Sequence, residues 1–363
     1  MRVLLSLLLT VLSLPLPAAP RLDQLSLPKG FHIAVYSDQV PGAREIALGA
    51  NGTVFVGSSG AGKVYALTDS NRDGLADKLR VVASGLRNPI GVAFHDGNLY
   101  VSAVSKIFVL HDIEQHLDAP PKPELVTDQL PGDGHHGGRF LAFGPDGKLY
   151  VPVGAPCNIC SPGPEYAKLI RMSADGRDWQ DVATGVRNTV GFDWQPGTKR
   201  LWFTDNGRDM LGDNIPSDEL NEVTRLGQNF GYPYCHQGDV PDPEFGKGHP
   251  CSEFVPPVLK LGAHVASLGM RFYAGKQFPA SYHGAILIAE HGSWNRTRKS
   301  GYRVMVVRLK GNKVLSYEPL ITGFEQNQSA WGRPVDVQPL PDGSVLVSDD
   351  LAGAVYRVTY QQP

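Results

Sequence analysis

The sequence predicts an all-β protein, namely a six-bladed β-propeller built from four-stranded antiparallel blades. A turn closed by glycine, followed by a strand of apolar and β-branched residues that ends in a small or acidic residue, occurs six times. Asp-Gly or Asn-Gly before alternating apolar residues is a strong hairpin signal, because the tight turn requires positive φ. The turn glycines lie 45, 50, 50, 87 and 59 positions apart, and periods of about 40 to 50 residues are typical of propeller blades. These glycines are Gly52, Gly97, Gly147, Gly197, Gly284 and Gly343.

The composition fits one closed domain. The 363 residues include 41 Gly and 29 Pro without a low-complexity run, which suits many short strands joined by turns. No linker or shift in composition divides residues 20–363, so we expect a single domain. The formal net charge of −2 provides neither a basic face for nucleic acid nor a polybasic patch for a membrane surface. Nucleic-acid partners and stable membrane insertion are therefore not expected.

Residues 1–19 have the layout of a secretory signal peptide. Arg2 precedes an apolar stretch, and small residues end the segment at Ala18 and Ala19. The apolar stretch is short for a spanning helix, although a retained anchor is the alternative. We therefore expect a periplasmic or secreted protein.

Strands from both ends of the mature chain are expected to complete one blade. Residues 31–36 and 354–360 both alternate apolar and polar side chains. Propellers protect their seam by pairing strands from the two termini, which removes an unpaired edge.

The longest spacing, between the fourth and fifth copies of the repeat, predicts an insertion at about residues 205–265. It contains several acidic residues and a loop with Cys235 and Cys251. Long structured insertions in a compact scaffold are usually functional, so we expect this one to lie near a site.

The four cysteines are expected to form two disulfides. Export to an oxidising compartment favours pairing by proximity, Cys157 with Cys160 and Cys235 with Cys251. A c-type haem attachment would need His after the second cysteine of the C-x-x-C, where Ser161 stands. The spacing of the second pair does not suit a four-cysteine zinc site.

One loop has the spacing of a calcium site. Asp69, Asn71, Asp73 and Asp77 form a D-x-N-x-D-G-x-x-D pattern. Ca²⁺ prefers six to eight oxygen ligands, and alternating acidic side chains around a glycine turn supply several of them. We expect a structural calcium ion here, and the alternative is an Asx-rich turn without metal.

Histidine and arginine occur in the loops next to the repeats. His135 and His136 lie among four glycines before the third repeat, and histidine suits a general base near neutral pH. Arg187, Arg296 and Arg333 lie in three other loops of this kind. Arginine suits bidentate carboxylate recognition, so converging loops would form a polyanion pocket. Each arginine taken alone is better explained by a surface or inter-blade ion pair, and only the three together favour the pocket.

Taken together, six stretches resemble the pyrroloquinoline quinone (PQQ)-dependent sugar dehydrogenases, in particular the sorbosone dehydrogenase-like and soluble aldose dehydrogenase-like propellers. The resemblance spans residues 27–360 and implies PQQ across the axial face beside a catalytic Ca²⁺. The matching stretches are residues 135–150, 186–188, 207–208, 262–264, 291–296 and 332–336.

The resemblance also implies individual roles. His135 would be the base that takes the hydroxyl proton of the sugar. Arg187 and Asn188 would contact the cofactor, and the carbonyls of Gly207 and Arg208 would bind the catalytic calcium. His264, Arg296 and Arg333 would lie around the carboxylates of the quinone.

One residue departs from the family pattern. Glucose-type members place Asp after the strand to orient the catalytic histidine, whereas this chain has Ala155. Either another group, for example Asp133, orients His135, or the basicity of His135 is lower. We therefore expect an aldose or a related polyol or aldehyde as substrate, and a separate cytochrome or quinone as electron acceptor. The alternatives are a calcium-dependent hydrolase of the lactonase type and a propeller that only binds sugars or proteins.

Overall fold

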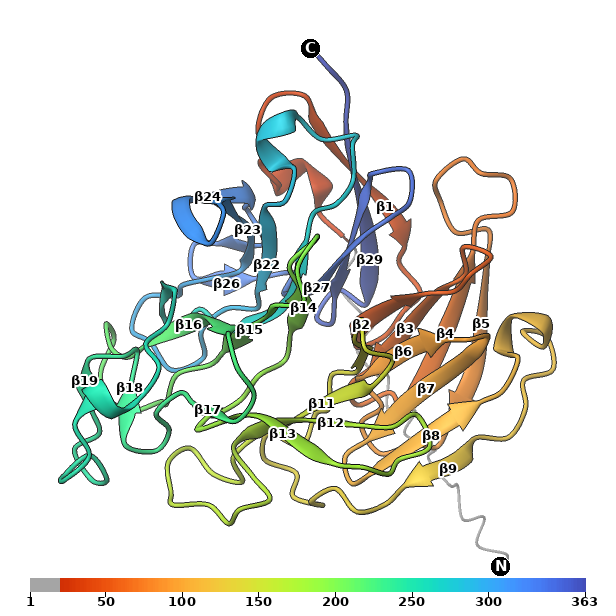
Figure 1. Ribbon diagram of the computed structural model, residues 1–363. Coiled ribbons are helices and arrows are strands. Elements are labelled where there is room, and N and C mark those ends of the chain that lie inside the picture. Colours follow the sequence, from red (N-terminus) through yellow and green to blue (C-terminus); the bar gives the residue numbers. More distant parts are fainter. Residues whose placement is uncertain (1–19) are drawn as a thin grey trace, which may run out of the picture.

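The computed structural model describes residues 20–363, and the predicted signal peptide lies outside them. Six sheets of four antiparallel strands, one of them extended by a short fifth strand, surround a central axis as the blades of a propeller (Figure 1), which confirms the predicted fold class. Helix in this part of the chain is limited to short 3-10 turns, which are η1 (Leu22–Gln24), η2 (Ile113–Gln115), η3 (Cys251–Glu253) and η4 (Ala280–Tyr282).

The first three blades follow one another along the chain. Their strands, from the axis outwards, are β2 (Ala43–Leu48), β3 (Val54–Ser58), β4 (Lys63–Thr68) and β5 (Lys78–Ser84); β6 (Val92–His95), β7 (Asn98–Ala103), β8 (Lys106–Leu110) and β9 (Glu124–Thr127); and β10 (Ala142–Phe143), β11 (Leu149–Val153), β12 (Lys168–Met172) and β13 (Gln180–Thr184).

The last three blades have the same order of strands. They are β14 (Phe192–Trp194), β15 (Leu201–Asp205), β16 (Ser217–Val223) and β20 (Leu259–Ala263); β21 (Ser267–Phe272), β22 (Ile286–Glu290), β23 (Arg303–Lys310) and β24 (Lys313–Ile321); and β27 (Pro334–Pro339), β28 (Val345–Asp349), β29 (Ala354–Tyr360) and β1 (Phe31–Ser37). A small hairpin, β25 (Glu325–Gln326) and β26 (Ser329–Ala330), precedes the sixth blade.

The termini close the ring as the sequence predicts. β1 is the outer strand of the last blade and pairs antiparallel with β29, with Phe31 opposite Tyr360. The Phe31 ring also packs edge-on against Phe278 of the fifth blade, with ring centroids 4.8 Å apart.

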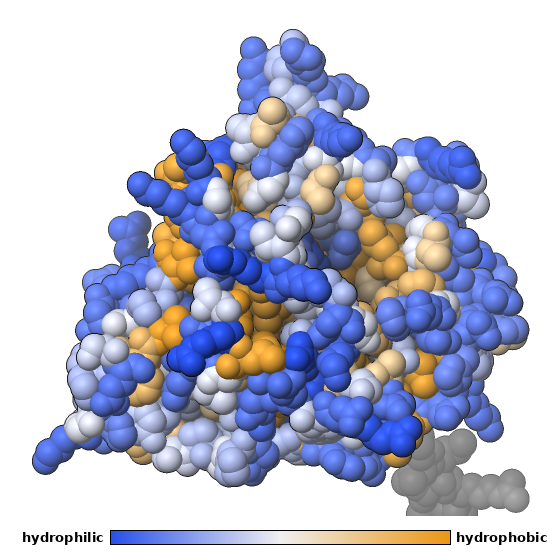
Figure 2. Space-filling model, viewed as in Figure 1, coloured by the Kyte–Doolittle hydropathy of each residue, from blue (hydrophilic) through white to orange (hydrophobic). Residues whose placement is uncertain are grey.

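The repeated turn joins the first and second strands of each blade. Its glycine has positive φ in all six copies, between 72° and 86°. The second strand lies between two neighbouring sheets, and for this reason all five residues of β3, β11, β15, β22 and β28 are buried. Six apolar clusters join consecutive blades around the ring. Hydrophilic residues cover most of the face in Figure 2, and apolar residues show mainly in its hollows.

The chain leaves the fourth blade between β16 and β20, inside the expected insertion. There β17 (Gln228–Asn229) pairs parallel with β13 of the third blade, and β18 (Cys235–His236) pairs with β19 (Val240–Pro241). Both predicted disulfides are present, Cys157–Cys160 after β11 and Cys235–Cys251 within this segment. Within residues 20–363, no helix has the length and apolar character needed to cross a lipid bilayer.

Candidate active site

A cavity of about 300 Å³ lies at one end of the propeller axis, where loops of several blades converge. Most of its lining residues are polar, while Val190 and Leu268 belong to a small apolar cluster with Ile90 and Val335, in or just before the inner strands. The charged and titratable side chains in the lining are Arg44, His136, Arg187, Asp209, Asp218, His264, His291 and Arg333.

Three guanidinium groups from three blades line this cavity. Two of them, Arg187 and Arg333, were expected from the sequence, and Asn188 lies beside Arg187 in the lining. Arg333 is held by the carbonyls of His291 and Gly292, at 3.0 Å from Nε and 2.7 Å from Nη2.

Arg44, at the start of β2, is the third guanidinium and was not identified from the sequence. Its Nη1 donates to Asp350 at 2.9 Å, and Asp350 also contacts His291 Nε2 at 2.8 Å. The Nε of Arg44 is buried without a hydrogen-bond partner in the structure. Because the Arg44 side chain lines the cavity, its positive charge favours an anionic ligand there. Its sequence signal was weak, because an arginine at the start of an inner strand looks like an ordinary inter-blade ion pair.

Acidic residues at the ends of the repeated strands hold the arginine loops. Asp205 ends β15 and accepts hydrogen bonds from the backbone N–H groups of Arg187 (2.9 Å) and Asn188 (2.6 Å). Asp349 ends β28 and accepts from the Arg333 N–H at 2.9 Å. Burial raises the pKa of both carboxyl groups, that of Asp349 to about 6. The acidic end of the repeat therefore fixes the loop that precedes the same blade.

His136 is the histidine of the glycine-rich loop that lines the cavity. Its Nδ1 is 2.8 Å from the carbonyl oxygen of Ala155, so Nδ1 carries the proton and Nε2 is left as an acceptor. Burial and the nearby Arg187 lower the pKa of His136 to about 2, which keeps the ring neutral.

His135, the residue expected as base, does not line the cavity. Its side chain is exposed, and its ring packs on that of His136 with centroids 4.0 Å apart. Burial, and to a lesser extent the charge of Arg187, also lowers the pKa of His135. The expected orienting group is also different: the Asp133 carboxylate accepts a hydrogen bond from the Tyr166 hydroxyl, and the Ala155 carbonyl orients His136 instead.

His264 lines the cavity, and its contact with the cofactor stays a prediction. Its Nε2 is 2.7 Å from the Gly212 carbonyl, and its Nδ1 is 3.7 Å from Asp209. Asp209 raises the pKa of His264 above its ordinary value. Its neighbour in the lining, Asn206, donates to the carbonyl of Ser267 at 2.7 Å.

Arg296 does not reach the cavity, contrary to the expectation. Its Nε donates to the Asp213 carbonyl at 2.9 Å and its Nη2 to Asn214 at 3.2 Å. These partners satisfy the guanidinium outside the lining.

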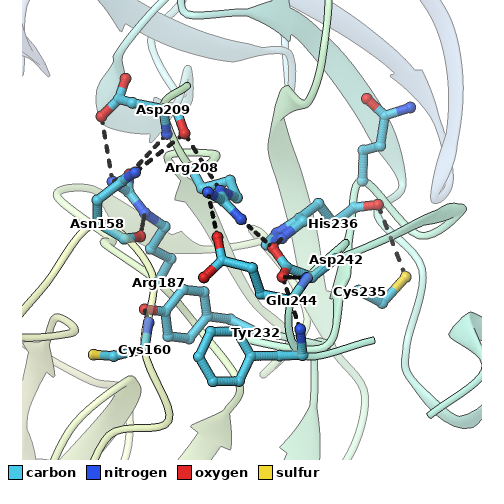
Figure 3. Close-up of polar contacts among 12 residues, drawn as sticks. Asn158, Cys160, Arg187, Arg208, Asp209, Tyr232, Cys235, His236, Asp242 and Glu244 are labelled. Carbon is cyan, nitrogen blue, oxygen red and sulfur yellow. Dashed lines mark hydrogen bonds and ion pairs between the residues drawn. The ribbon is translucent and has the colours of Figure 1, made fainter. Parts of the chain in front are cut away.

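Of the two residues expected to bind the catalytic calcium, only Gly207 lines the cavity. Its N–H donates to Asp218 at 3.0 Å. The Arg208 side chain turns away toward Asp242, at 2.6 Å, and Glu244 (Figure 3). Within residues 20–363, no three His, Cys, Asp or Glu side chains are grouped as metal ligands. Oxygen donors for a hard cation are nevertheless present in the lining at Gly207, Asp209 and Asp218.

The predicted calcium loop joins β4 to β5 and takes no part in the axial cavity. Its side chains accept hydrogen bonds from backbone N–H groups of the loop itself, as in an Asx-rich turn. Asp69 accepts from Gly74 at 2.8 Å, and Asp77 accepts from Ser70 at 2.6 Å. The second carboxylate oxygen of Asp69 is buried without a partner in the structure. A calcium ion at this loop stays a prediction.

Comparison with known proteins places the chain in a family. The sequence model of the family described as TrAA12-like matches residues 25–361. The chain belongs to the TrAA12-like family.

Two relatives are similar in sequence over much of the chain. An uncharacterized protein of Borreliella burgdorferi is 33% identical over 365 residues, 96% of this TrAA12-like chain and 94% of that protein. Aldose sugar dehydrogenase YliI of Escherichia coli is 24% identical over 265 residues, 64% of this chain and 63% of that protein.

Two solved structures show the same fold over nearly the whole TrAA12-like chain. The holo form of the pyranose dehydrogenase PQQ domain from Coprinopsis cinerea has a TM-score of 0.78 at 20% identity and covers 95% of this chain and 98% of its own. The calcium structure of Trichoderma reesei Carbohydrate-Active Enzymes Family AA12 has a TM-score of 0.79 at 20% identity and covers 97% of this chain and 100% of its own. The resemblance to the PQQ-dependent sugar dehydrogenases is thereby confirmed.

Proposed function

We propose that this TrAA12-like protein is a PQQ- and calcium-dependent oxidoreductase that oxidises an aldose or a related polyol or aldehyde. The observation that carries the proposal is the ring of Arg44, Arg187 and Arg333 around one axial cavity. PQQ carries three carboxylates, and guanidinium groups on separate blades suit their recognition. The names of the pyranose and aldose sugar dehydrogenases among its relatives support a sugar substrate.

When bound, the quinone would supply the two-electron acceptor for hydride from the carbon that is oxidised. The chain supplies binding, orientation and a base. His136 would take the substrate hydroxyl proton at Nε2, since the Ala155 carbonyl keeps the proton of the ring on Nδ1. The cavity lining favours His136 over the neighbouring His135 for this role.

A calcium ion would act as a Lewis acid next to the substrate oxygen. The carbonyls of Gly207 and Arg208 are the proposed ligands, with Asp209 and Asp218 contributing negative charge nearby. The calcium structure of the Trichoderma reesei protein supports calcium for this family. We also propose a structural calcium at the Asp69 loop.

The remaining expectations concern the setting of the enzyme. Two disulfides support export, so we propose a periplasmic or secreted protein. Electrons would pass to a separate cytochrome or quinone. A lactonase-type hydrolase would hold an axial metal with several carboxylates, whereas guanidinium, imidazole and amide groups dominate this wall.

The proposal is tested by titrating the full chain with PQQ in the presence of Ca²⁺ and following the absorbance of the cofactor. Dye reduction is then measured over a panel of aldoses, and lactone hydrolysis is measured in parallel. Saturable binding and sugar-dependent dye reduction are expected. If neither occurs, or if only lactones are turned over, the proposed oxidation is incorrect.

A further inference from the structure

The loop closed by the Cys157–Cys160 disulfide lies directly against the Arg187 guanidinium (Figure 3). This loop follows β11 of the third blade, whereas Arg187 precedes β14 of the fourth. The sequence suggested only a structural staple at this position. The contacts indicate a more specific role.

Asn158 holds two of the three nitrogen atoms of the Arg187 guanidinium. Arg187 Nε donates to the Asn158 backbone carbonyl at 2.8 Å, and Nη2 donates to its side-chain oxygen at 2.9 Å. The third nitrogen, Nη1, donates to the Asn206 carbonyl at 3.1 Å. The Arg187 side chain is only 5% exposed, so these contacts determine which way the guanidinium points.

Asn158 also joins the third blade to the fourth. Its side-chain oxygen accepts the Asp209 N–H at 2.8 Å, and its side-chain amide donates to the Asp209 carbonyl at 3.1 Å. The Asp209 carboxylate in turn lies 3.5 Å from Arg187 and 3.7 Å from His264. The Asn158 side chain therefore contacts Arg187 and Asp209 directly, and Asp209 links it to His264.

The disulfide and Tyr232 keep Asn158 in place. The Tyr232 hydroxyl accepts the Cys160 N–H at 3.1 Å and lies 3.3 Å from the sulfur of Cys157. The four-residue loop belongs to no strand, so the covalent link and the contacts with Tyr232 limit its conformations.

We propose that Asn158 is a positioning residue for Arg187 and that the Cys157–Cys160 disulfide maintains it. Opening the disulfide would therefore weaken binding of a carboxylate ligand in the axial cavity. This inference rests on the proposed function only for the identity of that ligand.

The test measures PQQ affinity for four forms of the full chain in the presence of Ca²⁺. Asn158→Ala is expected to weaken binding about tenfold, because a hydrogen bond to a charged group and its alignment are lost. Cys157→Ser with Cys160→Ser is expected to weaken binding about fivefold to tenfold. The matched control is Cys235→Ser with Cys251→Ser, which removes the other disulfide and should change affinity less than twofold. Melting temperatures establish that each variant is folded.

Reduction gives a second route that needs no substitution. Dithiothreitol should weaken PQQ binding by wild type and by the Cys235/Cys251 variant, and reoxidation should restore it. The Cys157/Cys160 variant should not respond. Unchanged affinity in both Asn158→Ala and the Cys157/Cys160 variant would overturn the inference.

Crystal structures of wild type and Asn158→Ala separate this inference from the proposed function. If wild type does not bind PQQ, the proposed function fails, but the position of Arg187 still decides the inference. A guanidinium displaced from the cavity wall in Asn158→Ala supports the positioning role. A guanidinium in its wild-type position overturns it.

Discussion

Replacing His136 tests the assignment of the base most directly. Nδ1 is tied to the Ala155 carbonyl, so Nε2 is the atom available to take a proton inside the cavity. General-base catalysis contributes roughly 10²- to 10⁴-fold in rate. A group whose pKa lies at about 2 is a weak base, so we expect the lower end of that range. His136→Ala should thus lower kcat about a hundredfold, or roughly 3 kcal/mol.

The dependence of kcat on pH distinguishes the two adjacent histidines. With a lowered pKa of about 2, His136 stays neutral and competent throughout the range from pH 4.5 to 8.5. A base at the exposed His135 would lose activity as the pH falls through its pKa, which burial and Arg187 lower from its ordinary value. The kcat of the PQQ-loaded enzyme, measured by dye reduction, should therefore not fall at low pH through protonation of the base.

His135→Ala is the matched control, because it removes the adjacent imidazole outside the lining. It should lower kcat by less than about fivefold, and PQQ affinity should be measured for both variants. The reasoning fails if His136→Ala keeps more than a third of wild-type kcat while His135→Ala loses a hundredfold.

Three further results are expected. Arg44→Ala should weaken PQQ binding about tenfold, since the ligand would lose one of the three guanidinium groups that line the cavity, and Arg44→Lys should restore part of the affinity; equal affinity in an absorbance titration would contradict this. Burial raises the pKa of Asp218 from 3.8 to about 6, so the stabilisation by its protonated form is complete below pH 4 and is lost as the pH rises to 6. Urea unfolding should show wild type losing roughly 2–3 kcal/mol relative to Asp218→Asn across that window, and parallel curves would refute the shift. Calcium should raise the melting temperature of wild type, and an Asp69→Asn/Asp73→Asn variant should lose part of that increase; an unchanged increase would argue against an ion at this loop.

The fold could be predicted from the sequence because each blade repeats one local signal. The glycine turn and the apolar strand depend on neighbours within about ten residues. The alternation of apolar and polar side chains at both termini predicted that the terminal strands pair. The strand lengths and the partner of β17 could not be read in this way. β17 leaves its own blade and pairs with β13 of the preceding one, a contact set by packing rather than by local pattern.

The site was predicted in part for a related reason. The acidic residues that end the repeated strands bind the backbone N–H groups of Arg187, Asn188 and Arg333, so the place of these residues follows from the place of the blade. His264 directly follows β20, the outer strand of the fourth blade. His135 and Arg296 lie in loops where the direction of the chain decides which side chain faces the axis. Residue 136 has a positive φ of 49°, a conformation that sequence does not report for a histidine. The ring of His136 therefore lines the cavity, whereas the ring of the adjacent His135 is exposed.

The strand-end carboxylates explain why the cavity can hold cationic groups from separate blades at fixed positions. Asp205 and Asp349 bind the backbone N–H groups of the loops that carry Arg187 and Arg333, and not their guanidinium groups. These carboxylates fix the backbone of each loop, so the guanidinium group of each arginine stays available for contacts in the cavity wall. Asn158 fixes the side chain of Arg187 as well, because it accepts two hydrogen bonds from the guanidinium group. Removing Asp205 should consequently disturb the loop and its stability, whereas removing Asn158 should disturb the direction of one guanidinium and the affinity for an anion.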